Sequence, residues 1–227
     1  MNTGETNIGI NPVSLPGYLA PITRIGGGEV RVDRALAATT AAWDVDDLTG
    51  SLSFGYHALT GSKAFQKTVV VRNYSNQART YTITPEFRYA DDAASGAVTV
   101  SAPATVRVKA NSSASFNVKL QVDVTKLPLW NLNGGSLGGS GYLLQNFEFD
   151  GYLHITDASD AIHLAWHILP HRSAEVTPAT ESLALTEGMG ALELTNYGGA
   201  VDGRVEVFSL LGTSGRIPPP YLPGDGD

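Results

Sequence analysis

Hydrophobic and polar residues alternate with a period of two through the middle of the chain, most clearly in residues 65–72 and 80–89. A strand places successive side chains on opposite faces, so this pattern indicates strands with one face on a core and the other in water. The polar residues 75–77 separate the two runs and predict a β-hairpin. Pro85 lacks an N–H donor, so we expect the second strand to lie at a sheet edge or to carry a bulge there.

Further alternating runs lie before and after these two, separated by turn signals. They are residues 51–56, 97–100, 105–108, 115–124, 149–156 and 161–169. Residues 157–160 separate the last two runs and predict another hairpin. About seven short strands at spacings of roughly 8–12 residues predict an all-β fold, a β-sandwich of the fibronectin type III or immunoglobulin-like kind with extra strands.

The inward-facing apolar positions of these strands predict the core. They are Phe54, Val69, Val71, Tyr81, Ile83, Phe87, Phe116, Val118, Leu120, Leu153, Ile155, Leu164 and Trp166. Outside the strands, residues 1–31 show no sustained period, and residues 32–42 predict one short helix with an apolar stripe of Val32, Leu36 and Ala35. Residues 182–187, 191–196 and 202–211 predict three strands of a further β unit after a break at residues 173–180, followed by a Pro/Gly tail.

Composition narrows the classes of function. A net charge of -7 and a pI near 5.1 argue against a nucleic-acid partner, and no basic amphipathic stretch points to a membrane surface. No apolar run reaches the roughly 20 residues of a membrane-spanning helix. The absence of cysteine excludes disulfides and thiolate metal sites. The polar N-terminus has no features of a signal peptide, which leaves a cytosolic protein or a piece of a longer exported one.

Two parts of the chain carry a resemblance to a known family. Residues 1–6 (MNTGET) and 21–44 resemble the closing segment of the catalytic domain of subtilisin-like serine proteases. Gly28, Val30, Val32 and Ala35 fit the final G-x-V-x-V-x-x-A pattern of that family. Residues 65–83, 150–157 and 162–170 are similar to the fibronectin type III-like domain attached to large extracellular subtilases, including bacterial cell-envelope proteinases.

The resemblance implies three parts: residues 1–45 as the tail of the catalytic domain, 46–172 as the fibronectin type III-like sandwich, and 173–227 as a partial further β module with the tail. It implies a non-catalytic region of a protease that is secreted or at the bacterial cell surface, which spaces and orients the catalytic domain and helps to present protein substrate. The expected partner is the upstream catalytic domain of the same polypeptide, with no nucleic acid and no membrane insertion.

No catalytic, cofactor-binding or metal-binding residue is assigned, because the family's Asp, His and Ser motifs would all lie before Met1. Residues 212–215 (GTSG) lack the Met-Ala continuation of the nucleophile motif. Without the catalytic domain, residues 1–44 would lack partners for their apolar side chains. We expect them to dock on the sandwich, pair with another copy of the chain or stay mobile, and we expect residues 2–26 to be the least protected from hydrogen exchange. The alternative functions are an adhesion or carbohydrate-binding module and an intact small hydrolase with an unrecognised site.

The histidines are the remaining candidates for chemistry. His163, His167 and His171 are four residues apart, which on a strand places neighbours about 13 Å apart, too far for one metal ion. If residues 157–160 form a tight turn, His154 lies opposite His163, but no third zinc ligand is apparent, so a solvent-facing pair is the favoured interpretation.

Three other features have simple structural interpretations. Asp91-Asp92 and the Asp225–Asp227 tail lack calcium-loop spacing and are read as solvated turns. Trp130 is interpreted as a plug at the open end of the sandwich, with a carbohydrate-stacking platform as the alternative.

Overall fold

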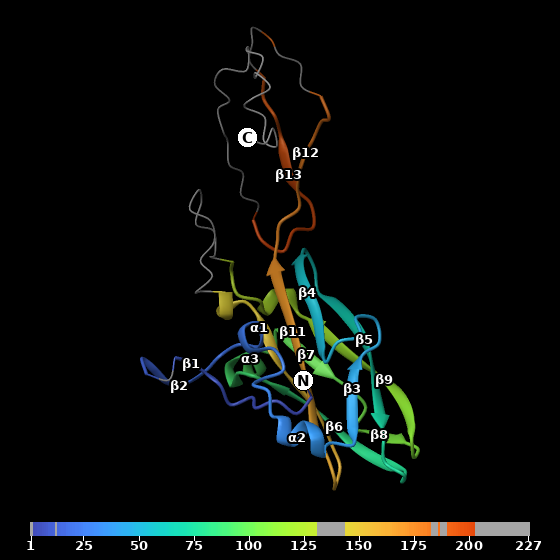
Figure 1. Ribbon diagram of the computed structural model, residues 1–227. Helices are drawn as coiled ribbons and strands as arrows, with labels where there is room; N and C mark the ends of the chain where they lie inside the picture. The colour runs from blue at the N-terminus through green and yellow to red at the C-terminus, as the bar shows by residue number, and fades with distance from the viewer. Residues whose placement is uncertain (1, 12, 131–143, 183–185, 187–189, 203–227) are drawn as a thin grey trace, which may run out of the picture.

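The computed structural model describes residues 2–11, 13–130, 144–182, 186 and 190–202, and it shows an all-β, immunoglobulin-like sandwich (Figure 1). The smaller main sheet has the order β3-β5-β9-β7 and is antiparallel throughout. Its strands are β3 (Thr40–Asp44), β5 (Lys63–Asn73), β9 (Ser112–Val122) and β7 (Val98–Ser101). The all-β fold class expected from the alternating pattern is confirmed.

The larger main sheet has the order β4-β11-β10-β6-β8. Its strands are β4 (Ser51–Leu59), β11 (Ala161–Arg172), β10 (Phe149–Thr156), β6 (Arg79–Phe87) and β8 (Thr105–Val108). Strands β4 and β11 are parallel, and the other neighbours are antiparallel. The hairpin expected around residues 157–160 is confirmed, because β10 and β11 pair in register and Asp157 N–H donates to Asp160 O at 2.9 Å.

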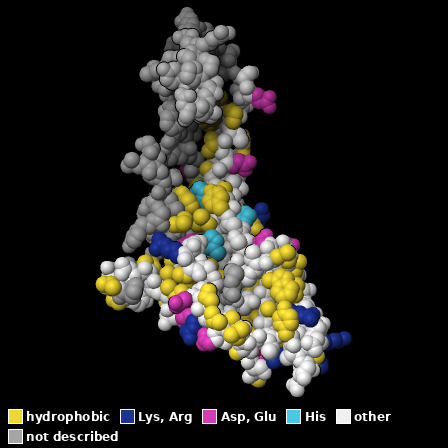
Figure 2. Space-filling view, in the orientation of Figure 1, with side chains coloured by type: hydrophobic (Ala, Val, Ile, Leu, Met, Phe, Trp, Pro, Cys, Tyr) yellow, Lys and Arg dark blue, Asp and Glu magenta, His cyan; other side chains and the backbone are white. Residues whose placement is uncertain are grey.

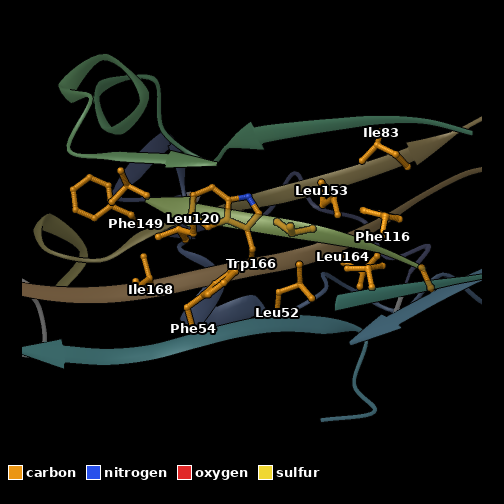
Figure 3. Close-up of a cluster of buried hydrophobic side chains, with 14 of the residues drawn as sticks. Leu52, Phe54, Ile83, Phe116, Leu120, Phe149, Leu153, Leu164, Trp166 and Ile168 are labelled. Atoms are coloured by element: carbon orange, nitrogen blue, oxygen red, sulfur yellow. The ribbon is translucent and has the colours of Figure 1, made fainter. Parts of the chain in front are cut away.

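One hydrophobic core fills the space between the two main sheets (Figure 3). Of the thirteen side chains expected inside, twelve are buried, and Phe87 is half-buried and packs against the same core. Trp166 stacks edge-on against Phe87 with ring centres 5.0 Å apart. Removing such side chains from water stabilises the fold by roughly 1.5–3 kcal/mol each. The alternation therefore predicted the inward face of each of these strands correctly.

The hairpin expected at residues 75–77 is wrong, because β5 and β6 lie in different sheets. Buried Asn73 ends β5 and redirects the chain: its Oδ1 accepts from Ser75 N–H at 2.9 Å, and its Nδ2 donates to Gln77 O and Lys109 O at 2.7 and 3.2 Å. The connection therefore crosses from one main sheet to the other. The period-two alternation within two strands is the same whether they pair as a hairpin or lie in different sheets. Pro85 lies on β6 beyond the last residue of β6 that pairs with β8, Thr82, so its side toward β8 is an edge as expected.

Short elements precede the sandwich, and for the first three of them, within residues 1–31, no regular structure was expected. They are β1 (Gly9–Asn11), β2 (Leu15–Leu19), α1 (Ile22–Ile25) and α2 (Val32–Ala37), and β1 pairs with β2. The helix expected over residues 32–42 ends at Ala37, and no α2 residue is buried. Strand β3 then pairs with β5 along its whole length, so the sandwich begins before residue 46, and the expected boundary there is corrected. The assignment of the preceding residues to a protease tail stays a prediction.

After β11 the chain leaves the sandwich and forms a separate two-stranded sheet of β12 (Val176–Pro178) and β13 (Leu194–Asn196). Strand β12 lies in the expected break at residues 173–180, and β13 is the end of the expected strand 191–196. The expected strands at 182–187 and 202–211 lie largely outside the described residues. The remaining elements are α3 (Ala90–Ser95) and the 3₁₀ turns η1 (Val124–Lys126) and η3 (Leu144–Asn146). No helix in the described part is long and apolar enough to cross a membrane.

Candidate functional site

The candidate site is the surface where the N-terminal segment, residues 2–37, lies against the outer face of the larger sheet. Figure 1 shows the blue segment crossing this sheet with α1 next to β11. The outer-face residues Glu148, Asp150 and His163 are buried as a result, as is the small apolar cluster of Ile22, Tyr152 and Ala165. Of the three outcomes considered for residues 1–44, the structure shows docking on the sandwich, while the expectation that residues 2–26 are the least protected from hydrogen exchange stays a prediction.

Arg88, just after β6, forms hydrogen bonds with separate parts of the segment. Its guanidinium donates to the backbone oxygens of Thr6, Ile8 and Ala20 at 2.6, 3.1 and 2.9 Å. A guanidinium suits this position because it is always charged and presents five donors in a fixed plane. Arg88 therefore fixes the path of the segment on both sides of the β1–β2 hairpin.

A buried acidic group holds α1. The carboxylate of Asp150 accepts the backbone N–H of Ile22 at 2.5 Å, and Glu148 accepts the hydroxyl of Thr23 at 2.9 Å. His167 lies opposite Asp150 on β11, and its Nε2 is 3.2 Å from Glu148 Oε2. The second oxygen of Asp150 is buried and has no hydrogen-bond partner among the described residues.

Burial shifts the protonation of this group. It raises the pKa of Asp150 to about 6, with nearby Glu148 adding to the rise while the Ile22 N–H, His167 and Arg88 oppose it. Burial likewise raises the pKa of Asp92, on α3, to about 7, and the charges of Asp91, Asp150 and Glu148 act in the same direction. The pKa values of both carboxyl groups thus lie near neutral pH, and Asp150 is the one in contact with the segment.

A second anchor holds the chain between α2 and β3. Asp160 accepts the backbone N–H and the hydroxyl of Thr39 at 3.2 and 2.8 Å, the hydroxyl of Thr40 at 2.6 Å and the guanidinium of Arg79 at 2.6 Å. Burial opposes ionisation of Asp160, but these hydrogen bonds outweigh it and lower its pKa below the ordinary value. An ionised carboxylate in the turn between β10 and β11 therefore holds Thr39 and Thr40, at the start of β3.

The expected opposition of His154 and His163 is confirmed, but the two rings have different partners. His154 Nε2 is 2.6 Å from Glu86 Oε2, and His163 Nε2 is 2.9 Å from Gly27 O. The solvent-facing interpretation is wrong for His163, which is only 7% exposed because the N-terminal segment covers it. Burial lowers the pKa of His163. Within the described residues, no group of three His, Cys, Asp or Glu could hold a metal ion.

The other candidates lie elsewhere. Trp130 is partly buried between Phe147 and His171, with ring centres 5.1 and 4.3 Å away, which favours the plug interpretation. The row of His163, His167 and His171 runs along strand β11, and its members have separate partners. Asp91 is an exposed residue, whereas Asp92 turns inward and is no solvated turn residue. Residues 212–215 and the Asp225–Asp227 tail lie outside the described residues.

Three apolar side chains near the end of the N-terminal segment are exposed. Val30, Val32 and Leu36 are 79%, 61% and 83% exposed. Figure 2 shows yellow hydrophobic side chains at the surface in the lower part of the molecule, where α2 lies in Figure 1. The glycine-rich turn before this stretch is needed for close backbone approach: Gly28 has φ +98°, and a Cβ there would lie 2.4 Å from Glu5 O. Glu5 and Glu29 exchange backbone hydrogen bonds beside it.

The residues that hold the segment were missed from the sequence. Glu148, Asp150 and Arg88 occupy alternating polar positions at strand ends, which the period-two rule assigns to solvent.

No family model matches the chain, and no curated protein matches it. Solved structures that resemble it include a FixG-related protein from Vibrio parahaemolyticus (12% identity, 58% of this chain and 94% of that one, TM-score 0.35). Another is the secreted serine protease VesC from Vibrio cholerae (9% identity, 65% of this chain and 25% of that one, TM-score 0.36). A third is WR4, a C. elegans MSP family member (9% identity, 59% and 98%, TM-score 0.30). At these TM-scores the likenesses carry no argument about function.

Proposed function

We propose that this chain is a non-catalytic accessory region of a secreted bacterial subtilisin-like serine protease. Its sandwich holds the upstream catalytic domain in a set orientation and helps to present protein substrate. The observation that carries the proposal is the two-sided N-terminal segment. One side is fixed to the sandwich by Arg88, Asp150 and Asp160, and the other exposes Val30, Val32 and Leu36.

An exposed apolar row on a well-anchored segment fits a junction between two packed bodies. Contiguous exposed apolar side chains mark surfaces that pack against something else. The segment that exposes them is the one that resembles the end of a protease catalytic domain, and its Gly28, Val30 and Val32 carry that resemblance. A segment shared in this way transmits orientation, whereas a Gly/Ser-rich linker would leave the two parts free to turn.

The orientation role is tested on the longer polypeptide that includes the region encoded upstream of Met1. Arg88→Met is compared with Arg107→Met, a change at an exposed position on β8. We expect Arg88→Met to slow cleavage of a folded protein substrate several-fold while a short chromogenic peptide is cleaved at the original rate. Equal effects on both substrates, or an upstream region without an Asp/His/Ser protease, would contradict the proposal.

The isolated chain is expected to have no peptidase activity. A serine nucleophile needs a general base in direct contact, and the residues that match the family's catalytic motifs are absent from this sequence. A fluorophosphonate probe, which labels activated serines, should leave the folded chain unlabelled, with an active serine protease as the positive control. Stoichiometric labelling that disappears on substitution of one serine would instead support an intact hydrolase.

A second candidate is a carbohydrate-binding module, favoured by the aromatic group of Tyr56, Trp130 and His171 at one end of the sandwich. Tyr56 is 55% exposed, and its hydroxyl is 2.9 Å from His171 Nδ1. Aromatic faces of this kind stack on sugar rings. Retention on an insoluble polysaccharide that is lost in Tyr56→Ala but kept in Tyr74→Ala, another exposed tyrosine, would support this candidate over the first.

A further inference from the structure

A lysine and a carboxylate meet at the point where the chain enters the sandwich. Asp44 ends β3 and Lys67 lies on the neighbouring strand β5, two residues before Val69, the partner of Asp44 in the register. Both side chains belong to the inward faces of their strands. The side chain of Asp44 is fully buried and that of Lys67 is 13% exposed, and Lys67 Nζ contacts Asp44 Oδ2 directly.

Two further groups complete this arrangement. The other oxygen of Asp44, Oδ1, accepts the backbone N–H of Asp46 at 3.1 Å. A second carboxylate, Asp47, lies on the solvent side with its Oδ2 2.8 Å from the same Lys67 Nζ. A nucleophilic nitrogen thus touches a buried carboxyl group whose second oxygen is hydrogen-bonded, with a base beside the nitrogen. These are the parts that acyl transfer needs.

We propose that Lys67 and Asp44 condense to form an intramolecular amide bond between Lys67 Nζ and Asp44 Cγ. Asp47 takes a proton from the ammonium group and passes it to Asp44 Oδ2, which leaves a neutral amine beside a carboxylic acid. The nitrogen lone pair attacks Cγ, and the Asp46 N–H stabilises the charge that develops on Oδ1. Oδ2 then receives a second proton from the nitrogen through Asp47 and leaves as water, so that Asp47 ends ionised as it began.

The resting state before reaction is an ion pair. Burial on its own lowers the pKa of Lys67, but the hydrogen bonds to Asp44 and Asp47 outweigh it and raise that pKa. The neutral pair is therefore a minor state, although proton transfer inside a buried ion pair removes two charges that are costly to keep from water. The bond forms once per molecule, so a slow reaction is sufficient. Lys67 and Asp44 stay in contact throughout, because strand pairing holds them in place.

The bond would close a loop from residue 44 to residue 67 and join β3 to β5 covalently. Strand β3 is an edge strand that continues directly from the N-terminal segment. Tension on that segment would otherwise peel β3 from the sheet one hydrogen-bonded pair at a time. The inference goes beyond the proposed function and does not depend on it, since any pull on the N-terminus would load the same strand.

Intact-mass spectrometry of the purified, folded chain tests the proposal. We expect a mass lower than that of the summed residues by about 18 Da, one water molecule. Tryptic digestion should then yield a branched peptide that contains both Asp44 and Lys67. Lys67→Arg should have the full mass, and Asp47→Asn should react at least tenfold more slowly. Asp44→Asn should lose ammonia and reach the same product mass as the cross-linked parent.

The variants also separate this bond from ordinary dehydration. Asp-Gly sequences such as Asp150-Gly151 and Asp202-Gly203 can lose water to form a succinimide, and that loss would persist in Lys67→Arg. Lys119→Arg, at an exposed position on β9, controls for the loss of any lysine and should keep the cross-link. A full-mass parent after prolonged incubation of folded protein, or a water loss unchanged in Lys67→Arg, would overturn the proposal.

Discussion

Arg88 satisfies three backbone carbonyl groups of the N-terminal segment, and without its guanidinium those oxygens would lack these bonds. Asp150 and Asp160 do the same for backbone N–H groups of Ile22 and Thr39. A segment that buries few of its apolar side chains is thus held mainly through its main chain. Charged hydrogen bonds of this kind are stronger than neutral ones, and their loss costs more when the partner stays buried.

Arg88→Met should weaken docking of the segment by about 2–4 kcal/mol, since it keeps the length of the side chain but removes every donor. The measurement is the opening free energy of the Ala20 and Gly26 amides from native-state hydrogen exchange. Arg107→Met, at an exposed position, should change it by less than about 0.5 kcal/mol. Equal protection in the two variants would show that Arg88 does not hold the segment.

Leu120→Asp should abolish folding, because the side chain is fully inaccessible in the core-facing row of β9 and an unpaired buried charge costs several kcal/mol. Far-UV circular dichroism and urea unfolding would record the loss. Lys119→Asp, the next residue on the same strand, is exposed and should unfold close to the parent. A cooperative Leu120→Asp protein would mean that the faces of β9 are inverted.

The elements of the N-terminal segment are too short to be stable alone. Helix α1 has four residues and strand β1 has three, so neither forms without its contacts to the sheet. The carboxyl group of Asp150 contacts α1, and burial raises its pKa, which makes the docking of α1 sensitive to pH.

Docking of α1 should weaken as the pH rises from 5 to 8. Asp150 has a pKa of about 6 when docked against an ordinary value of 3.8, so the docked state binds this proton more tightly than the open state. Its contribution to the stability of docking is complete below pH 4 and is lost as the pH rises through 6. Hydrogen exchange of the Gly26 amide, corrected for intrinsic rate, measures this.

Asp150→Asn should flatten that pH dependence, because an amide keeps the size of the side chain without titrating. Lowered pKa values elsewhere, such as that of Asp160, act only at more acidic pH and should not disturb this window. Opening free energies that are constant from pH 5 to 8 in the parent chain would contradict the assignment of Asp150 as the titrating group.

At the scale of the whole molecule, the N-terminal segment is a third layer on part of the sandwich. Strands β10 and β11 are buried on both faces because the core covers one face and the segment covers much of the other. The larger sheet therefore depends on residues that precede the strands of the fold. This arrangement extends the cooperative unit beyond the boundary suggested by the resemblance.

Removal of residues 1–29 should lower the urea midpoint of the sandwich and increase its tendency to aggregate. The truncation exposes Tyr152 and Ala165 and leaves Asp150 and Glu148 without the partners Ile22 and Thr23. Unfolding followed by fluorescence of buried Trp166 measures the midpoint. A truncated chain as stable as the parent would show that the segment docks on the sandwich without stabilising it.

The sequence by itself determined which face of each strand is inward and the β10–β11 hairpin. These follow from local alternation and from turn residues, and twelve of thirteen expected core side chains are buried. Only the tertiary structure decided that β5 and β6 lie in different sheets, that β3 belongs to the sandwich, and that Arg88, Asp150 and Lys67 meet their partners. Alternation of apolar and polar residues shows only whether a strand face is covered. Which segment covers it depends on contacts between residues far apart in the sequence, such as Ile22 and Asp150.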